Sequence, residues 1–345
     1  MIRVLVVEDS PTVRQLLVAM LESDPEITVI GQAADGRDGV RQARQLEPDL
    51  ITMDVNMPEL DGLAATKEIM TLAPAPIIIV SSAANVSAVA LSLDATQAGA
   101  LMVLPKPESP LDPGFEAQRA QLTAMVKAMA QVKVVRRWAP RPPAFDRQSG
   151  SSASLPANLR IRLIAIGCST GGPAALRTLL DGFPPSFPLP IVVVQHMARS
   201  FVAGLATWLD GGSPLRVKVV ESRERLRGGI VYLAPDDYHL GIGSDGRAVF
   251  SDGPPIGGFR PSVTHLFASV ADSFGASSLA VIMTGMGNDG VAGLAQLKAA
   301  GGYVLAQDEA TSVVYGMAQE AVRSGLTDLV LPLDAIAPRI LELVR

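Results

Sequence analysis

Residues 161–173 have the sequence IRLIAIGCSTGGP, in which an apolar run is followed by a glycine-rich turn. The run Ile161–Ile166 predicts a buried β-strand, and the segment after Pro173 has the apolar period of a helix. Glycine permits a sharp strand-to-helix turn, and proline is favoured at the first helical position. Such a turn would expose Ser169 at a helix N-terminus, where free backbone N–H groups can stabilise an oxyanion. The G-x-S-x-G pattern alone also occurs in structural turns and phosphate-binding loops.

Two further polar residues follow predicted strands of the same segment. His196 comes directly after the apolar run Ile191–Gln195, and Asp289 comes soon after the run Leu279–Thr284. Because parallel strands end at one edge of a sheet, we expect both side chains to lie near Ser169. The set predicts a catalytic triad in which the serine is the nucleophile, the histidine is the general base and the aspartate orients the imidazole. The order Ser, His, Asp differs from that of α/β-hydrolases, which indicates an independent serine-hydrolase fold.

The chain has 345 residues, enough for two domains of ordinary size. Short apolar runs alternate with longer segments of helical period over residues 3–107, and again from residue 161 onward. This alternation predicts an α/β protein with two doubly wound parallel-sheet domains, the first flavodoxin-like and the second Rossmann-like. Residues 116–137 predict an amphipathic helix, and residues 138–158 predict an exposed linker rich in Pro and Ser. We therefore expect a first domain at residues 1–115 and a second domain at residues 159–345. Residues 116–158 should form a linker that is helical at first and then flexible.

Three carboxylates follow predicted strands of the first domain. Glu8 and Asp9 come after the first apolar run, and Asp54 comes at the end of the third. Acids gathered at one edge of a sheet repel each other unless a cation joins them, and Mg²⁺ prefers oxygen ligands. The backbone carbonyl of Asn56 could supply a further ligand. Any one of these acids could instead be a helix cap or a solvated loop residue, but the full set predicts a Mg²⁺ site.

A hydroxyl and a lysine are expected at the same edge. Ser81 follows the fourth predicted strand, and Lys106 follows the fifth. A cation and a lysine together can neutralise an incoming phosphoryl group, and a carboxylate can accept that group covalently. The first domain therefore predicts a site for an aspartyl phosphate at Asp54.

Composition excludes several classes of protein. The chain is 48% hydrophobic, but none of its apolar runs approaches the roughly 18 residues of a membrane span. The first predicted strand is followed at once by acidic residues, unlike a secretory signal, so we expect a cytoplasmic protein without direct membrane insertion. A net charge of −5 disfavours a nucleic-acid partner. The single Cys168 excludes an internal disulfide, and one Cys with three His gives no zinc spacing.

Residues 1 to about 110 resemble the receiver domain of two-component response regulators. The residues that carry the resemblance are Glu8, Asp9, Asp54, Ser81 and Lys106. The resemblance implies that Asp54 accepts a phosphoryl group from a histidine kinase. It also implies that the neighbouring acids help to hold Mg²⁺, and that the serine and the lysine contact the phosphoryl group. Receivers commonly carry Phe or Tyr three residues before the lysine, where this chain has Val103. This chain therefore lacks the aromatic residue that receivers commonly use as part of the switch.

Residues 160–345 resemble the catalytic domain of the bacterial chemotaxis protein-glutamate methylesterases. The motifs that carry the resemblance are Gly-Cys-Ser-Thr-Gly-Gly, Val-Gln-His-Met, Ala-Pro-Asp-Asp-Tyr-His, Arg-Pro-Ser-Val and Met-Thr-Gly-Met-Gly-Asn-Asp-Gly. The resemblance implies hydrolysis of glutamyl methyl esters on methyl-accepting chemotaxis receptors, with release of methanol, and deamidation of receptor glutamines. It maps the triad onto Ser169, His196 and Asp289. The implied oxyanion donors are the backbone N–H groups of Met286 and Thr170.

The two resemblances together imply a hydrolase that phosphorylation activates. The expected partners are the receptors, as substrate, and a chemotaxis histidine kinase, as phosphodonor. The hydrolase reaction should need no cofactor, because the triad and the oxyanion donors carry the chemistry. We expect the receiver to cover the active-site cleft at rest, and phosphorylation of Asp54 to open it.

Three residues near the predicted triad have simpler expected roles. Cys168 stands where the family usually has Ala, and we expect it to be a small buried hydrophobe. His239 lies in a turn-rich stretch, which favours a surface position over a place in the cleft. His265 lies in a predicted helix, where a structural role is expected.

Three other functions are less consistent with the sequence than a hydrolase. A DNA-binding response regulator is disfavoured by the acidic balance and by the lack of a helix-turn-helix signature. A non-catalytic receptor adaptor is disfavoured because the residues of the triad are all present. A nucleotide-binding domain is disfavoured because the glycine pattern from Gly167 lacks both G-x-G-x-x-G and G-K-[ST].

Overall fold

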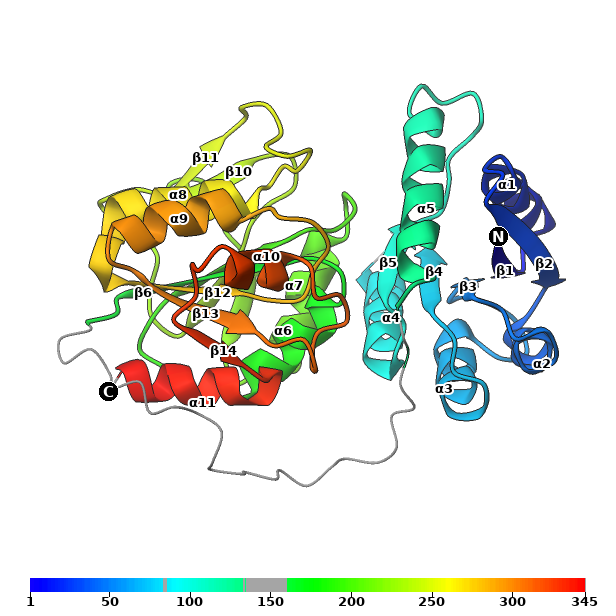
Figure 1. Ribbon diagram of the computed structural model, residues 1–345, viewed down its shortest axis with the longest axis horizontal. Helices are drawn as coiled ribbons and strands as arrows, with labels where there is room; N and C mark the ends of the chain where they lie inside the picture. The colour runs from blue at the N-terminus through cyan, green and yellow to red at the C-terminus, as the bar shows by residue number, and fades with distance from the viewer. Residues whose placement is uncertain (83–85, 133, 135–159, 345) are drawn as a thin grey trace. The chain divides into compact units, whose positions relative to one another are not determined.

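The computed structural model describes residues 1–82, 86–132, 134 and 160–344. Within these residues the chain forms two compact units, each with its own parallel β-sheet, and Figure 1 labels their elements. The linker predicted over residues 138–158 lies outside the described residues. The two sheets confirm the expected α/β fold class.

The first unit contains a five-stranded sheet with the order β2-β1-β3-β4-β5. This is the order of flavodoxin-like doubly wound folds, as the sequence predicts. Strands β3 and β4 are buried at every residue, as expected for a parallel sheet that is covered on both faces. The strands are β1 (Ile2–Val7), β2 (Ile27–Ala33), β3 (Leu50–Met53), β4 (Ile77–Ser81) and β5 (Met102–Pro105).

Helices cover both faces of this first sheet. They are α1 (Pro11–Glu22), α2 (Gly36–Leu46), α3 (Gly62–Leu72), α4 (Val86–Ala98) and α5 (Phe115–Met129). Figure 1 shows α1 and α5 on one face, with α2 and α3 on the other. Ser10 caps α1 by accepting a hydrogen bond from the Val13 N–H. Because this cap directly follows Glu8 and Asp9, the start of α1 fixes one side of the acidic edge.

Helix α5 ends earlier than the sequence predicts. We expected a helix that continues to Arg137, but α5 ends at Met129, and the Ala130 N–H donates to the Val126 carbonyl. The buried side chains of α5 are Leu122, Val126 and Met129. A helix in a protein is stabilised mainly by packing of its apolar face, so α5 ends at its last buried residue.

The second unit contains a seven-stranded parallel sheet with the order β14-β13-β12-β6-β7-β9-β8. Strands β6, β7 and β12 are buried at every residue and form the centre of the core. The chain runs from β6 to β7 on one side and later returns to β12 on the other, so the strand order reverses at β6. Ligands of open α/β sheets bind at the carboxyl ends of strands at such a switch point. The strands are β6 (Leu163–Cys168), β7 (Ile191–Gln195), β8 (Arg216–Val219), β9 (Ile230–Leu233), β12 (Ser278–Ile282), β13 (Tyr303–Gln307) and β14 (Leu329–Leu331).

The second sheet is also covered on both faces. Figure 1 shows helices α8 and α9 on one face, with α6 and α11 on the other, so this sheet is doubly wound as predicted. The helices of this half of the chain are α6 (Gly172–Asp181), α7 (Val202–Asp210), α8 (Val263–Phe274), the 3₁₀ turn η1 (Gly275–Ser277), α9 (Val291–Ala299), α10 (Met317–Arg323) and α11 (Leu333–Val344). Among the described residues, no helix combines the length and the apolar character needed to cross a membrane.

An antiparallel hairpin, which we did not predict, precedes helix α8. It consists of β10 (His239–Ile242) and β11 (Ala248–Ser251), which form a separate two-stranded sheet. The sequence Gly-Ser-Asp-Gly at residues 243–246 is a turn signal that could have predicted it. Strand β10 is held on helix α8, because the Ile242 N–H donates to Ser269 Oγ at 3.1 Å. The hairpin therefore fixes where the segment between β11 and α8 begins.

Candidate functional site

Ser169 and His196 follow neighbouring strands at the switch point. The last residues of β6 and β7, Cys168 and Gln195, lie opposite each other in the sheet. The His196 N–H donates to the Cys168 carbonyl at 3.0 Å, which continues the ladder beyond the strand end. Asp289 comes from the loop after β12, the strand on the other side of β6. The structure thus brings the three predicted residues to adjacent strand ends.

Ser169 lies on the tight turn between β6 and α6. Its N–H donates to the Thr284 carbonyl at 3.0 Å, and its carbonyl accepts from the Gly172 N–H at 2.8 Å. Gly171 has a φ of +76°, a left-handed conformation that favours glycine. Among the described residues, no hydrogen bond occupies the backbone N–H of Thr170. The turn therefore offers a free donor beside the serine, at the N-terminus of α6.

The loop after β12 passes against Ser169 at Gly285. A Cβ added at Gly285 would lie 2.7 Å from the Ser169 Cβ and 2.5 Å from Met317 Sδ, closer than real Cβ contacts. Only glycine permits this approach. The Gly285 N–H donates to the Val314 carbonyl at 3.0 Å, whereas the N–H of the next residue, Met286, has no partner within the described part of the chain. A second free backbone donor thus lies one residue from the contact with Ser169.

Gln195 joins the two turns, although its side chain was not predicted to belong to the site. Its Nε2 donates to the Ser169 carbonyl at 2.8 Å and to the His196 carbonyl at 2.7 Å. A Cβ added at Gly172 would lie 1.8 Å from Gln195 Oε1, so the carboxamide fills the space beside that glycine. A polar residue at the end of an apolar, fully buried strand was the available signal, because a buried amide needs hydrogen-bond partners.

The Asp289 carboxylate accepts hydrogen bonds from both sides. Oδ2 contacts His196 Nε2 at 2.9 Å and accepts from the Val263 N–H at 2.7 Å. Oδ1 accepts from the Ser262 hydroxyl at 2.8 Å and from the Thr264 N–H at 3.0 Å. Helix α8 begins at Val263, so the carboxylate lies at a helix N-terminus, where negative charge is stabilised.

These contacts keep Asp289 ionised. Burial alone would raise the pKa of Asp289, but the hydrogen bonds from His196 and Thr264 outweigh it and hold that pKa well below its ordinary value. A negative Asp289 requires the proton of the neutral imidazole to be on His196 Nε2. The other ring nitrogen, Nδ1, is buried and has no hydrogen-bond partner among the described residues. That nitrogen therefore presents a lone pair that can accept a proton.

Two neighbouring residues differ in how well the sequence predicted them. Cys168 is buried, and burial raises the pKa of its thiol far above the ordinary value, which confirms the expected apolar role. The surface position expected for His239 is wrong, because the unpredicted hairpin places it on β10 with 1% of its surface exposed. Its Nε2 contacts the Pro254 carbonyl at 3.0 Å, and its ring stacks on that of His265 with centroids 4.9 Å apart.

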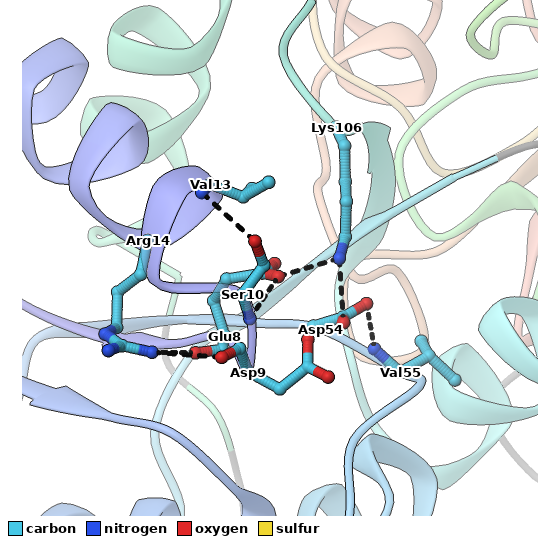
Figure 2. Close-up of polar contacts among 8 residues, drawn as sticks. All are labelled: Glu8, Asp9, Ser10, Val13, Arg14, Asp54, Val55 and Lys106. Atoms are coloured by element: carbon cyan, nitrogen blue, oxygen red, sulfur yellow. Dashed lines mark hydrogen bonds and ion pairs between the residues drawn. The ribbon is translucent and has the colours of Figure 1, made fainter.

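Figure 2 shows the acidic cluster at the carboxyl edge of the first sheet. Carboxylate oxygens of Glu8, Asp9 and Asp54 lie within 4.8 Å of one another. Lys106 Nζ donates to Glu8 Oε1 and to Asp54 Oδ2, both at 2.8 Å. Asn56, two residues after Asp54, is exposed. The side chains from β1, β3 and β5 that the sequence places at one edge therefore do meet there.

The acidic cluster fits a divalent cation. Glu8 Oε2 and Ser81 Oγ are buried without a hydrogen-bond partner among the described residues. Burial raises the pKa of Glu8, and although Lys106 lowers it, the charge of Asp54 raises it further. Burial also lowers the pKa of Lys106, but its hydrogen bonds to Asp54 and Glu8 raise that pKa above the ordinary value. The unsatisfied Glu8 oxygen, together with the neighbouring Asp9 and Asp54 carboxylates, is compatible with Mg²⁺, which takes oxygen ligands.

Arg14, which was not predicted to belong to the site, holds the turn that carries Glu8 and Asp9. Its Nη1 donates to the Glu8 carbonyl at 2.6 Å and to the Asp9 carbonyl at 3.4 Å. The Ser10 N–H adds a hydrogen bond to Glu8 Oε1 at 3.2 Å. The available signal was a basic residue near the start of helix α1, where the helix dipole disfavours positive charge.

The two folds and their sites define a response regulator in which a receiver is joined to an enzymatic α/β domain. The family model described as "Response regulator receiver domain" matches residues 4–112. The family model described as "CheB methylesterase" matches residues 164–340. The acidic cluster lies within residues 4–112, the match to the receiver model. Ser169, His196 and Asp289 lie within residues 164–340, the match to the methylesterase model.

Full-length relatives agree with both family models. The chain is 49% identical over 346 residues to protein-glutamate methylesterase/protein-glutamine glutaminase 4 of Myxococcus xanthus (strain DK1622), covering 100% of this chain and 97% of that protein. It is 49% identical over 342 residues to protein-glutamate methylesterase/protein-glutamine glutaminase 3 of Anaeromyxobacter dehalogenans (strain 2CP-C), covering 99% and 98%. The crystal structure of the Thermotoga maritima CheB methylesterase catalytic domain covers 53% of this chain and 99% of its own, with 41% identity and a TM-score of 0.52. The chain belongs to the CheB family of protein-glutamate methylesterases.

The raised pKa of Glu8 predicts that Mg²⁺ binding depends on pH. A carboxylate must be ionised to bind the cation, so the affinity should rise as the pH rises through that pKa, with protons released on binding. Calorimetric titration of the full chain with Mg²⁺ over a pH series measures both effects. The variant Glu8→Gln should bind more weakly and lose this pH dependence, whereas the exposed Glu68→Gln should behave as the parent. An affinity of the parent chain that does not change with pH would contradict the assignment.

Proposed function

We propose that this chain hydrolyses glutamyl methyl esters on methyl-accepting chemotaxis receptors, with release of methanol, and that it deamidates receptor glutamines. The observation that carries the proposal is the turn at Ser169 next to His196, whose Nε2 is bonded to an ionised Asp289. The names of the Myxococcus and Anaeromyxobacter relatives, each a methylesterase and glutaminase, support both activities.

The proposed reaction is an acyl transfer in two steps. Ser169 Oγ attacks the γ-carbonyl carbon of the substrate, and its proton moves to His196 Nδ1. The oxyanion accepts hydrogen bonds from the backbone N–H groups of Thr170 and Met286, which have no other partner among the described residues. His196 returns the proton to the leaving group, so methanol departs from an ester and ammonia from an amide. Water, deprotonated by the same imidazole, then attacks the acyl-enzyme and releases the glutamate.

Asp289 and Gln195 prepare this machinery before the substrate binds. The ionised Asp289 fixes the tautomer of His196 and stabilises the imidazolium that forms when the serine proton is transferred. Gln195 keeps the two turns in register through its bonds to the Ser169 and His196 carbonyls. The hydrolytic reaction needs no cofactor in this scheme.

The receiver controls the reaction through Asp54, which accepts a phosphoryl group from a chemotaxis histidine kinase. The bonds of Lys106 to Asp54 and Glu8 support this role, because they place a positive charge where the phosphoryl group would arrive. Bound Mg²⁺ would neutralise charge on that group. Ser81 would contact a phosphoryl oxygen through its hydroxyl, which is buried without a partner in the part of the chain that the structure describes. The Mg²⁺ ligands would be Glu8, Asp9, Asp54 and the Asn56 backbone carbonyl.

We assign residues 1–115 to the receiver, 116–158 to the linker and 159–345 to the catalytic domain. The spans of the two family models, 4–112 and 164–340, support these limits.

Replacing the nucleophile tests the proposed chemistry. Ser169→Ala should reduce methanol release from methylated receptor by about 10³-fold or more, because the acyl-enzyme can no longer form. Ser186→Ala, which removes an exposed hydroxyl of the same domain, should release methanol at the parent rate. Release that persists in the Ser169 variant would refute the hydrolase mechanism, and a receptor-dependent activity without methanol would point to an adaptor.

Replacing the phosphoryl acceptor tests the proposed regulation. A small phosphodonor such as acetyl phosphate, with Mg²⁺, should increase methanol release by the parent chain, and Asp54→Ala should abolish that increase while keeping the basal rate. Glu68→Ala, which removes an exposed carboxylate from α3, should still respond. Equal stimulation of the parent and the Asp54 variant would mean that the receiver does not act through Asp54.

A further inference from the structure

Phe259 lies flat against the imidazole of His196. The two ring centroids are 3.9 Å apart, and the ring planes are within 2° of parallel. Phe259 is half-buried and comes from the segment between β11 and α8. Contact through the ring face leaves both imidazole nitrogens at the ring edge, where Nε2 meets Asp289 and Nδ1 has no partner among the described residues. Phe259 therefore touches the imidazole without competing for its nitrogens.

The segment that carries Phe259 is held by its own hydrogen bonds. The Phe259 N–H donates to the Ile256 carbonyl at 3.0 Å, and the Ile256 N–H donates to the Phe259 carbonyl at 3.1 Å. The two glycines between them have φ values of +58° and +89°, which favour glycine. Arg260 Nη1 donates to the Asp252 carbonyl at 2.9 Å and so ties the two ends of the segment together. The ring is thus presented by a small closed turn.

We propose that Phe259 is a positioning residue that stabilises the protonated imidazole of His196 while it holds the proton of Ser169. This inference rests on the proposed function, in which His196 is the general base. The face of a phenyl ring carries negative charge density and attracts a cation within about 6 Å of its centroid. At 3.9 Å the imidazolium gains more from this face than the neutral imidazole does. The ring therefore stabilises the state that forms during proton transfer.

The charged groups near the imidazole are consistent with this role. Asp289 contacts Nε2 from the loop after β12 and favours the same charged state. Arg260, the neighbour of Phe259, has its guanidinium on the carbonyls of Asp252 and Gly253. On the adjacent strand β6, Cys168 stays protonated, because burial raises the pKa of its thiol. The face of Phe259 thus supplements the effect of Asp289.

The test compares Phe259→Leu, which removes the ring face but keeps an apolar side chain, with Phe259→Tyr, which keeps the face. Methanol release by the phosphodonor-activated full chain is measured over a pH series. In the Leu variant the plateau kcat should fall about 3- to 30-fold with KM unchanged. The acid limb of the profile, where kcat falls as the pH is lowered, should move about 0.5 to 1.5 pH units to lower pH. The Tyr variant should stay within about twofold of the parent. Phe250→Leu, which removes a ring stacked on Tyr238, should change neither quantity.

A merely structural role gives a different result. A fall in kcat without movement of the acid limb, or a Tyr variant as impaired as the Leu variant, would overturn the inference. If the Leu variant does not fold, the Tyr variant is joined by Phe259→Trp, which should move the acid limb to higher pH because indole binds cations more strongly. An acid limb unmoved in the Trp variant would also overturn it.

A second readout separates this inference from the proposed function. NMR titration of the His196 imidazole is performed in the Ser169→Ala chain, with and without Phe259→Leu. The Leu substitution should lower the pH at which the imidazole titrates by the same amount as it moves the acid limb. No movement there contradicts the stacking effect itself. A moved titration together with an unchanged kcat supports the stacking effect but contradicts the role of His196 as the base.

Discussion

The catalytic unit depends on how the start of helix α8 holds the Asp289 carboxylate. A buried charge is costly unless it is fully hydrogen-bonded, and here the Ser262 hydroxyl and the backbone N–H groups of Val263 and Thr264 satisfy it. These bonds fix the loop after β12 to the helix, and the remaining contact fixes His196 at the end of β7. One carboxylate thus joins three separate elements. Because it stays ionised, it also decides which imidazole nitrogen is free to accept a proton.

The same architectural rule places both sites of the chain. In each sheet the strands are parallel, so the side chains that follow them gather at the carboxyl edge. In the first unit this edge collects Glu8, Asp54 and Lys106 from β1, β3 and β5. In the second it collects Ser169 and His196 from β6 and β7. A receiver and a hydrolase can therefore be built on similar frames, with different chemistry in the loops.

Strand ends could be predicted from the sequence, and contacts between distant segments could not. Asp54 and Lys106 were placed together because an apolar run of the correct length precedes each of them. Gln195 and Phe259 were missed because their roles depend on carbonyls or rings that other segments supply. His239 was misplaced because a short hairpin carries a weaker periodic signal than a βα repeat. The predicted end of helix α5 was too late in the sequence, because the helix ends where its apolar side chains stop packing against the rest of the domain.

A serine-directed reagent tests whether Asp289, through His196, activates Ser169. The full chain is treated with a serine-directed fluorophosphonate, and the modified peptide is identified by mass spectrometry. Activation of Ser169 through His196 predicts a label on Ser169, formed about 10²- to 10⁴-fold more slowly in Asp289→Asn, whereas Asp272→Asn, an exposed change on α8, reacts at the parent rate. A label on another residue, or equal rates in the parent and the Asp289 variant, would contradict it.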